Sequence, residues 1–246
     1  MVYRFEVEKI SQHVVKYSVD IRPPILPESG LAEIRSYGDW LVERFPGLYE
    51  TVVSGHRQLR IQRTLGLPNG MRVEVPTFAL MSHGPVFSFP QRLYIGSAHS
   101  PDLPEKNETF RQALSELRAR FAGRVVPRVL VSHELVFDTA AVNSLEIIAS
   151  DLQKDCWRTV KNLRIHMRPP VEDRNVDIAI WPTRLQHIGR DIAAVEPDGQ
   201  FGIAVHVDIS DPKMVRDLSE AQLNDVLSFA DDYIGKGLIK FLNGEA

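Results

Sequence analysis

The chain has 246 residues, of which 43% are hydrophobic and 25% are charged, and its formal net charge is −3 at pH 7. A chain of this length buries roughly 70–75% of the surface of its unfolded form, so it needs no disulfide to hold a core. Its single cysteine, Cys156, excludes an internal disulfide and a zinc site of several thiolates, and we expect it in an apolar helix face. The small acidic excess disfavours a dedicated duplex nucleic-acid binder, which usually clusters Lys and Arg.

The first half of the chain predicts a strand, a helix, four strands and a second helix. Residues 14–21 alternate between apolar and polar side chains, as in a half-buried strand. Apolar side chains at helical spacing over 31–45 predict a helix. Short alternating runs separated by Gly, Pro and Asn follow over 49–96 and predict four strands. We expect the second helix to begin with Asn107 as its N-cap and to end before Gly123.

The second half repeats this order. The expected elements are a strand at 128–138, a helix at 140–157, strands near 162–169, 175–182, 190–196 and 201–210, and a final helix whose apolar face runs from Leu223 to Leu242. Matching positions in the two halves lie about 111–115 residues apart, as duplication of one unit would leave behind. The alternative is that any α+β chain can be cut into two similar strings.

These patterns predict an α+β fold in which two pseudo-repeated β-α-β4-α units form one extended antiparallel sheet with the helices on one face. The units span residues 1–123 and 124–246 and pack as a single compact domain. One sheet face is then left without helices. The element order resembles a duplicated TATA-binding-protein-like fold, and this resemblance carries no function with it.

A family resemblance rests on stretches that include VVKYSVDIRPP, FRQALSELRARF, VPRVLVSHELVFD and GIAVHVDIS. Together they look like the uncharacterised, "sporadically distributed" family of bacterial proteins, over nearly the whole chain. The shared signal is hydrophobic pattern and element order. The resemblance implies the same fold and a bacterial cytoplasmic setting, and it transfers no activity and no functional residue.

The N-terminal run Phe5-Glu6-Val7-Glu8-Lys9 invites comparison with the ExExK strand of triphosphate-tunnel enzymes. In that strand two carboxylates and a lysine point into one barrel. Here the lysine comes one position early, so in a strand Lys9 would face away from Glu6 and Glu8. The run therefore favours an ordinary N-terminal or edge strand.

His206 and Asp208 share one face of a predicted strand. With His166 from a neighbouring strand they could ligate a divalent metal, and the alternative is a hydrogen-bonded pair on a solvated face. We adopt the alternative, with no metal and no cofactor. Asp231 and Asp232, in the final helix, are expected to face water.

A set of basic and aromatic residues forms the candidate binding surface: Arg60, Arg72, Arg164, His166, Arg168 and Trp181. Arg164, His166 and Arg168 alternate with apolar residues and share one strand face. If all these side chains lie on the helix-free face, their charges attract an anion, a nucleic acid or an acidic partner, and Trp181 adds a stacking platform. The alternative is a solvated face without a ligand.

The sequence contains no G-x-S-x-G nucleophile motif and no Gly-rich phosphate loop, and no catalytic residue is assigned. We therefore expect a non-enzymatic binding or assembly module that uses the helix-free face or the C-terminal helix, as a homodimer or with a protein partner. The alternative is an enzyme or nucleic-acid-binding protein that acts on a phosphodiester through His166, His206 and Asp208. The charged N-terminus and the lack of a long apolar run predict a cytoplasmic protein without a membrane segment.

Overall fold

The structure, a computed structural model, describes residues 3–25, 27–55, 58–66, 72–81, 84–92, 103–139, 164–171, 173–183 and 202–245. Within these ranges nine strands form one antiparallel sheet in the order β2-β3-β4-β5-β1-β6-β9-β8-β7. In chain order the strands are β1 (Ile10–Arg22), β2 (Thr51–Gly55), β3 (Gln58–Gly66), β4 (Arg72–Met81), β5 (Gly84–Arg92), β6 (Val125–Asp138), β7 (Ile165–Met167), β8 (Asn175–Thr183) and β9 (Gly202–Ser210). The long strands β1 and β6 pair in the middle.

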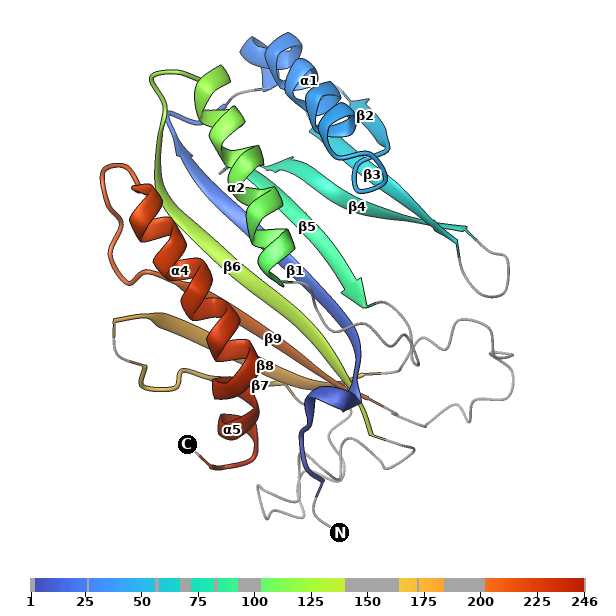
Figure 1. The fold of residues 1–246 in the computed structure, drawn as a ribbon, viewed down its shortest axis with the longest axis vertical. Helices are drawn as coiled ribbons and strands as arrows, with labels where there is room; N and C mark the ends of the chain where they lie inside the picture. Colours follow the sequence, from blue (N-terminus) through green and yellow to red (C-terminus); the bar gives the residue numbers. More distant parts are fainter. Residues whose placement is uncertain are drawn as a thin grey trace.

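The described helices cross one face of this sheet (Figure 1). They are α1 (Pro27–Arg44), α2 (Leu103–Arg120) and α4 (Glu220–Asp232), which continues through a π-helical turn at Tyr233–Gly237 into α5 (Leu238–Leu242). The predicted α+β class and the antiparallel sheet are thus confirmed. None of the described helices is both long and apolar enough to span a lipid bilayer.

The predicted alternation in β1 decides which side chains face the helices. Val15, Tyr17 and Val19 are completely buried, whereas the intervening Lys16 is only partly buried. The ring of Tyr17 stacks on Phe110 of α2, with ring centroids 4.3 Å apart. Burial of these large side chains is worth roughly 25 cal/mol per Å² of apolar surface and holds α2 over β1. Lys16, Ser18 and Asp20 are therefore left on the opposite sheet face.

The apolar stripe of the final helix belongs to the same core. Its buried residues are Leu223, Val226, Leu227, Ala230, Ile234 and Leu238. Helix α4 packs on β6 and β9. These side chains are buried in the protein's own core. The apolar stripe of the C-terminal helix, which was expected to offer a surface for a partner, is therefore not exposed.

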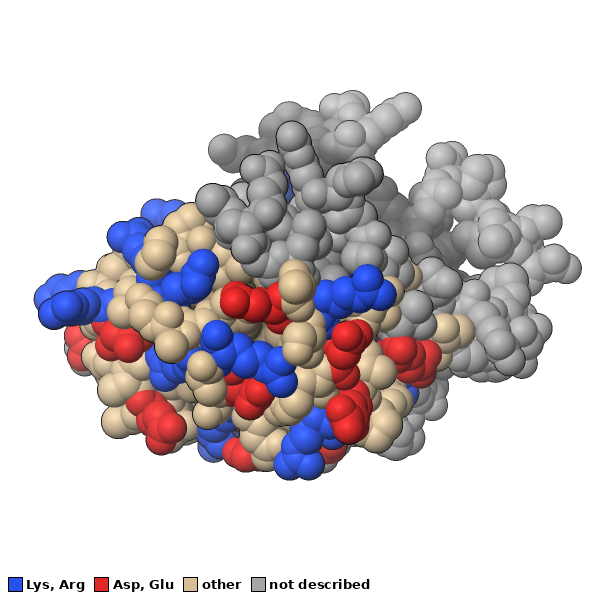
Figure 2. Space-filling model, turned by 90° about the horizontal axis from the view of Figure 1, so that it is seen from above, with Lys and Arg blue, Asp and Glu red and all other residues tan. Residues whose placement is uncertain are grey.

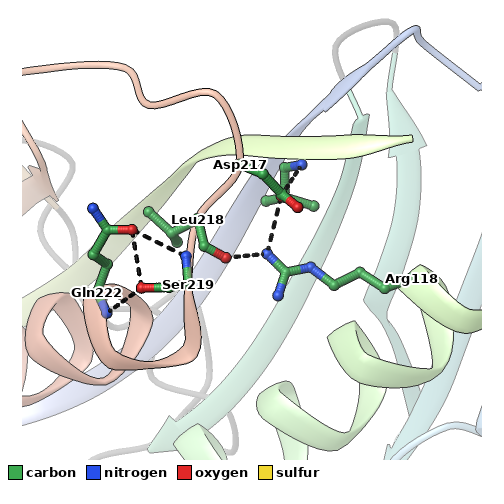
Figure 3. Close-up of polar contacts among 6 residues, drawn as sticks. Arg118, Asp217, Leu218, Ser219 and Gln222 are labelled. Atoms are coloured by element: carbon green, nitrogen blue, oxygen red, sulfur yellow. Dashed lines mark hydrogen bonds and ion pairs between the residues drawn. The ribbon is translucent and has the colours of Figure 1, made fainter. Parts of the chain in front are cut away.

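Arg118 connects α2 to the start of α4 (Figure 3). Its Nη2 donates a 2.6 Å hydrogen bond to the carbonyl of Leu218 and lies 3.5 Å from Oδ1 of Asp217. The same oxygen of Asp217 accepts the backbone N–H of Val126, in β6, at 2.8 Å. Ser219 then caps α4 through a capping box. These contacts fix α2, β6 and α4 to one another at this end of the helices.

Three local predictions are wrong. Val7–Lys9 is a 3-10 turn rather than a strand, and Lys9 pairs with Glu6 at 3.2 Å. Asn107 is not an N-cap but lies inside α2, where it accepts a hydrogen bond from Tyr17 and donates one to Asp231, both at 2.7 Å. Asp231 is consequently half-buried instead of facing water, whereas Asp232 is exposed as expected. For Asn107 and Asp231, a contact with another side chain overrides the local pattern.

Part of the second half cannot be compared with its prediction. The expected helix at 140–157, which contains Cys156, and the expected strand at 190–196 lie outside the described residues. Strand β7 pairs over only three residues, because Pro169 follows closely and has no N–H to donate to a neighbouring strand.

Candidate functional site

The sheet face opposite to the helices, called the distal face below, carries a polar cluster near its centre. Strand register arranges its side chains in rows. One row contains Lys16, Ser132, Asp208 and Asp177, and the next contains Glu134, His206, Ala179 and His166. Each strand contributes alternate residues to this face, so β1, β6, β9 and β8 all deliver polar groups to the same region.

Five of these side chains form a continuous network, called the central network: Lys16, Glu134, His206, Asp208 and Ser132. Lys16 Nζ pairs with Glu134 Oε1 at 2.5 Å, and the same carboxylate oxygen lies 3.8 Å from Nδ1 of His206. His206 Nε2 lies 2.9 Å from Asp208 Oδ1, which also accepts the hydroxyl proton of Ser132 at 2.5 Å. The predicted His206–Asp208 hydrogen bond is therefore present.

The network shifts the acidity of its members. The hydrogen bond with Asp208 raises the pKa of His206 above its ordinary value, and this exceeds the opposing effect of partial burial. Burial by itself would raise the pKa of Asp208, but the hydrogen bonds from His206 and Ser132 outweigh it and lower that pKa. The pair is therefore stabilised as imidazolium and carboxylate.

This arrangement is suited to recognition rather than to nucleophilic catalysis. A serine nucleophile is activated by a base that accepts its proton, usually an imidazole. Ser132 instead donates to Asp208, and a carboxylate with a lowered pKa is a weak base. What the central network offers is a fixed array of hydrogen-bond donors and acceptors.

A second group on the distal face, called the β7–β8 corner, consists of Arg164, His166, Arg168 and Trp181. The guanidinium of Arg164 lies over the ring of Trp181, 4.6 Å from its centroid. Arg168 forms an ion pair with Asp177. His166 is exposed and is paired in register with Ala179 of β8. The structure thus brings these four predicted site residues together at one end of the sheet.

Arg60 and Arg72 are not part of this group. Arg60 is exposed and shares its row with Ala79, Val86 and Ser18, which places it on the distal face. Arg72 begins β4, opposite Gly66. Strands β3 and β7 are seven steps apart in the sheet, on the order of 30 Å at the usual strand spacing. The predicted basic residues therefore do not form one cluster.

His166 also does not join the His206–Asp208 pair. Both histidines are register partners of Ala179, from opposite sides, so a whole strand separates them. The described residues contain no group of three or more His, Cys, Asp or Glu that is placed to hold a metal ion.

Lys16, Ser132 and Glu134 were not among the site residues predicted from the sequence. A signal for them existed, because Ser132 and Glu134 alternate with Val131 and Leu135 in β6. What was missing was the knowledge that β6 lies between β1 and β9. Without that order, their contacts with Lys16 and His206 could not be foreseen.

A groove of about 300 Å³ lies between α2 and α4, on the helix side of the sheet. Leu114 and Leu223 line it together with charged side chains that include Arg111, Arg118 and Glu220. Arg111 already pairs with Glu108 at 3.1 Å, and Arg118 is bound to Leu218. The groove's basic groups are thus engaged within the protein.

Comparison with known proteins finds no relative: no family model, no curated protein and no solved structure matches the chain. The resemblances to the "sporadically distributed" bacterial family and to the TATA-binding-protein-like fold therefore stay predictions.

Proposed function

We propose that the chain is a non-enzymatic binding or assembly module whose ligand surface is the distal face. The central network carries this proposal. Four of its side chains keep between 25% and 41% of their surface exposed while they hold one another in place. Side chains that are already ordered lose little conformational entropy when a partner binds. The network therefore favours recognition of a partner at this place.

The pairing of charges favours a protein as that partner. Lys16 and Arg168 already have carboxylate partners, and His206 pairs with Asp208, so these cations are not free to bind a long polyanion. Figure 2 shows a similar mixture of basic and acidic side chains over the described surface at the upper end of the molecule. A protein surface of both signs complements such a pattern.

The test is affinity capture with a tagged chain from the cells that encode it. We expect the same partner to be recovered with the wild type and with Lys236→Ala, a control at an exposed position of the C-terminal helix. A Glu134→Ala, His206→Ala double variant should lose that partner while its thermal unfolding stays cooperative. Recovery of the partner at wild-type level by the double variant would show that the distal face is not the surface.

The rival function is an enzyme that acts on a phosphodiester through His206 and Asp208, whose contact at 2.9 Å favours this second candidate. It makes a different prediction. Hydrolysis of bis(p-nitrophenyl) phosphate by the wild type, abolished by His206→Ala, would support the enzyme and count against the binding module.

We also infer that the two halves descend from one duplicated unit, spanning 1–123 and 124–246. The sheet order supports this: β1 is flanked by β5 and β6 by β9, and each outer strand is followed along the chain by a helix, α2 or α4. In this scheme β1 of the first half and β6 of the second half are equivalent strands. An experimental structure in which the halves fail to superpose would remove the inference.

A symmetric homodimer is the assembly we propose for the chain, because β2 and β7 are the outermost of the described strands. Sedimentation at micromolar concentration tests it. A species of twice 27.8 kDa is expected, and a monomer alone contradicts the proposal.

A further inference from the structure

We propose that the β7–β8 corner binds a nucleoside monophosphate, with the phosphate at Arg164 and His166 and the base against Arg164 and Trp181. The inference goes beyond the proposed function, since it places a small ligand on another part of the same distal face. It adds a ligand class and a subsite that is separate from the central network.

Arg164 differs from its neighbouring cation in having no carboxylate partner. Arg168, four residues further along, is engaged by Asp177. Arg164 makes no hydrogen bond or ion pair with the described residues, and it is exposed beside the ring of Trp181. A cation held over an aromatic ring keeps its planar N–H groups at the ring's edge available for an oxyanion. The corner therefore contains a positioned guanidinium whose charge is not neutralised.

His166 stands on the same side of β7 as Arg164. Two residues along a strand correspond to about 6.6 Å, so both side chains can reach one phosphate group. His166 is exposed and makes no hydrogen bond or ion pair with the described residues. An exposed imidazole can donate one hydrogen bond, and a guanidinium can donate two in parallel. Together they match the oxygens of a phosphate monoester.

The aromatic part of the ligand has a place beside Trp181. The residues next to Trp181 on the same face are small: Ala179 precedes it in β8 and Ala204 is its register partner in β9. Alanine side chains are short, so they leave space on the sheet surface beside the partly exposed indole. The guanidinium and the indole are flat groups of the kind on which nucleic-acid bases stack.

The surrounding carboxylates limit the ligand to a small one. Asp177 lies in the row next to Ala179, and Asp208 and Glu134 lie on the two strands beyond β8. A second or third phosphate continuing across the sheet would approach these groups within one or two strand spacings of about 4.8 Å. A single phosphate at the outer edge avoids them. A mononucleotide therefore fits the corner better than a nucleic-acid strand.

Isothermal titration of the full chain with AMP tests the proposal, with adenosine and inorganic phosphate as the two part-ligands. We expect AMP to bind more tightly than either part. Arg164→Gln should weaken AMP binding at least tenfold, whereas Arg60→Gln, at an exposed arginine of the same face outside the corner, should change it less than twofold. Trp181→Leu should weaken AMP and leave phosphate unchanged, and Trp181→Phe should restore most of the loss.

Three outcomes overturn the inference. The first is no AMP binding by the wild type at millimolar concentration, and the second is an equal loss of AMP affinity in the two arginine variants. The third is tighter binding of oligo-dT than of AMP when the two are compared at equal concentrations of phosphate groups. None of them decides the proposed function, because the capture experiment depends on Glu134 and His206. Conversely, a failed capture experiment leaves AMP binding at the corner intact.

Discussion

His13 of β1 and His133 of β6 lie side by side in the core, with Nε2 of His13 3.0 Å from Nδ1 of His133. Both side chains are buried on the helix side of the sheet. One ring must donate to the other, and the second nitrogen of each ring has no hydrogen-bond partner among the described residues. Burial lowers the pKa of His13 to about 4, and burial together with His13 lowers the pKa of His133 well below its ordinary value.

Acid should therefore destabilise the fold through this pair. The unfolded chain binds protons at the ordinary histidine pKa of 6.5, and the folded chain does not until about pH 4, so stability is lost as pH falls between these values. For His13 alone the loss by pH 5 is about 2 kcal/mol. Urea unfolding at pH 7.5 and pH 5 measures it.

A His13→Leu, His133→Leu double variant provides the control for this effect. Replacing both partners by apolar groups of similar size should change the free energy of unfolding little at pH 7.5. It should also remove most of the difference in that free energy between pH 7.5 and pH 5. His206 contributes with the opposite sign, because a raised pKa stabilises the fold at low pH, and it is unchanged in this variant. His166→Gln, at an exposed position, should keep the wild-type difference. An unchanged difference in the double variant would show that other groups cause it.

Replacing Asp208 by Asn should lower the pKa of His206. The hydrogen bond to the Asp208 carboxylate is the largest cause of the raised value, and an amide carries no charge to stabilise the imidazolium. NMR titration of the His206 ring proton measures the change. Asp177→Asn, in the neighbouring strand of the same row, is the matched control and should leave this titration in place. Equal shifts in both variants would contradict the assignment.

Asp217→Ala should destabilise the protein by about 1–2 kcal/mol, because it leaves the N–H of Val126 without its acceptor and removes a contact of Arg118. Thermal unfolding measures the loss. Asp232→Ala removes an exposed carboxylate that pairs with Lys236 at 3.5 Å, and it should cost less than about 0.5 kcal/mol. If the two variants lose equal stability, the hydrogen bond between Asp217 and Val126 does not contribute to stability as predicted.

Two glycines of the π-helical turn should respond to alanine in opposite directions. A Cβ at Gly237 would lie 2.7 Å from Cδ2 of Tyr233, whose ring is stacked on Phe229, so Gly237→Ala should cost about 1–3 kcal/mol. A Cβ at Gly235 meets nothing within 4 Å, and Gly235→Ala should stabilise the helix by about 0.5–1 kcal/mol. Comparison of the two melting temperatures checks the packing around Tyr233.

The prediction of the distal face shows how far periodicity leads. Alternation correctly placed His166 with Arg164 and Arg168, and His206 with Asp208, on a common side of their strands. Residue type misled at Asn107, which is typical of an N-cap but forms hydrogen bonds with Tyr17 and Asp231 inside α2. A capping preference is worth about 1 kcal/mol, which two buried hydrogen bonds readily exceed.

The sequence by itself determined most of the described strands and helices and the apolar side of the long strands, because these follow from the fixed periods of the backbone over a few neighbouring residues. Only the tertiary structure decided that β6 pairs with both β1 and β9, and so that Lys16 meets Glu134 across 118 residues of chain. Periodicity contains no information about which strand will lie next to which. That choice is made by the register and packing of the whole sheet, and it alone assembles the central network, the β7–β8 corner and the His13–His133 pair.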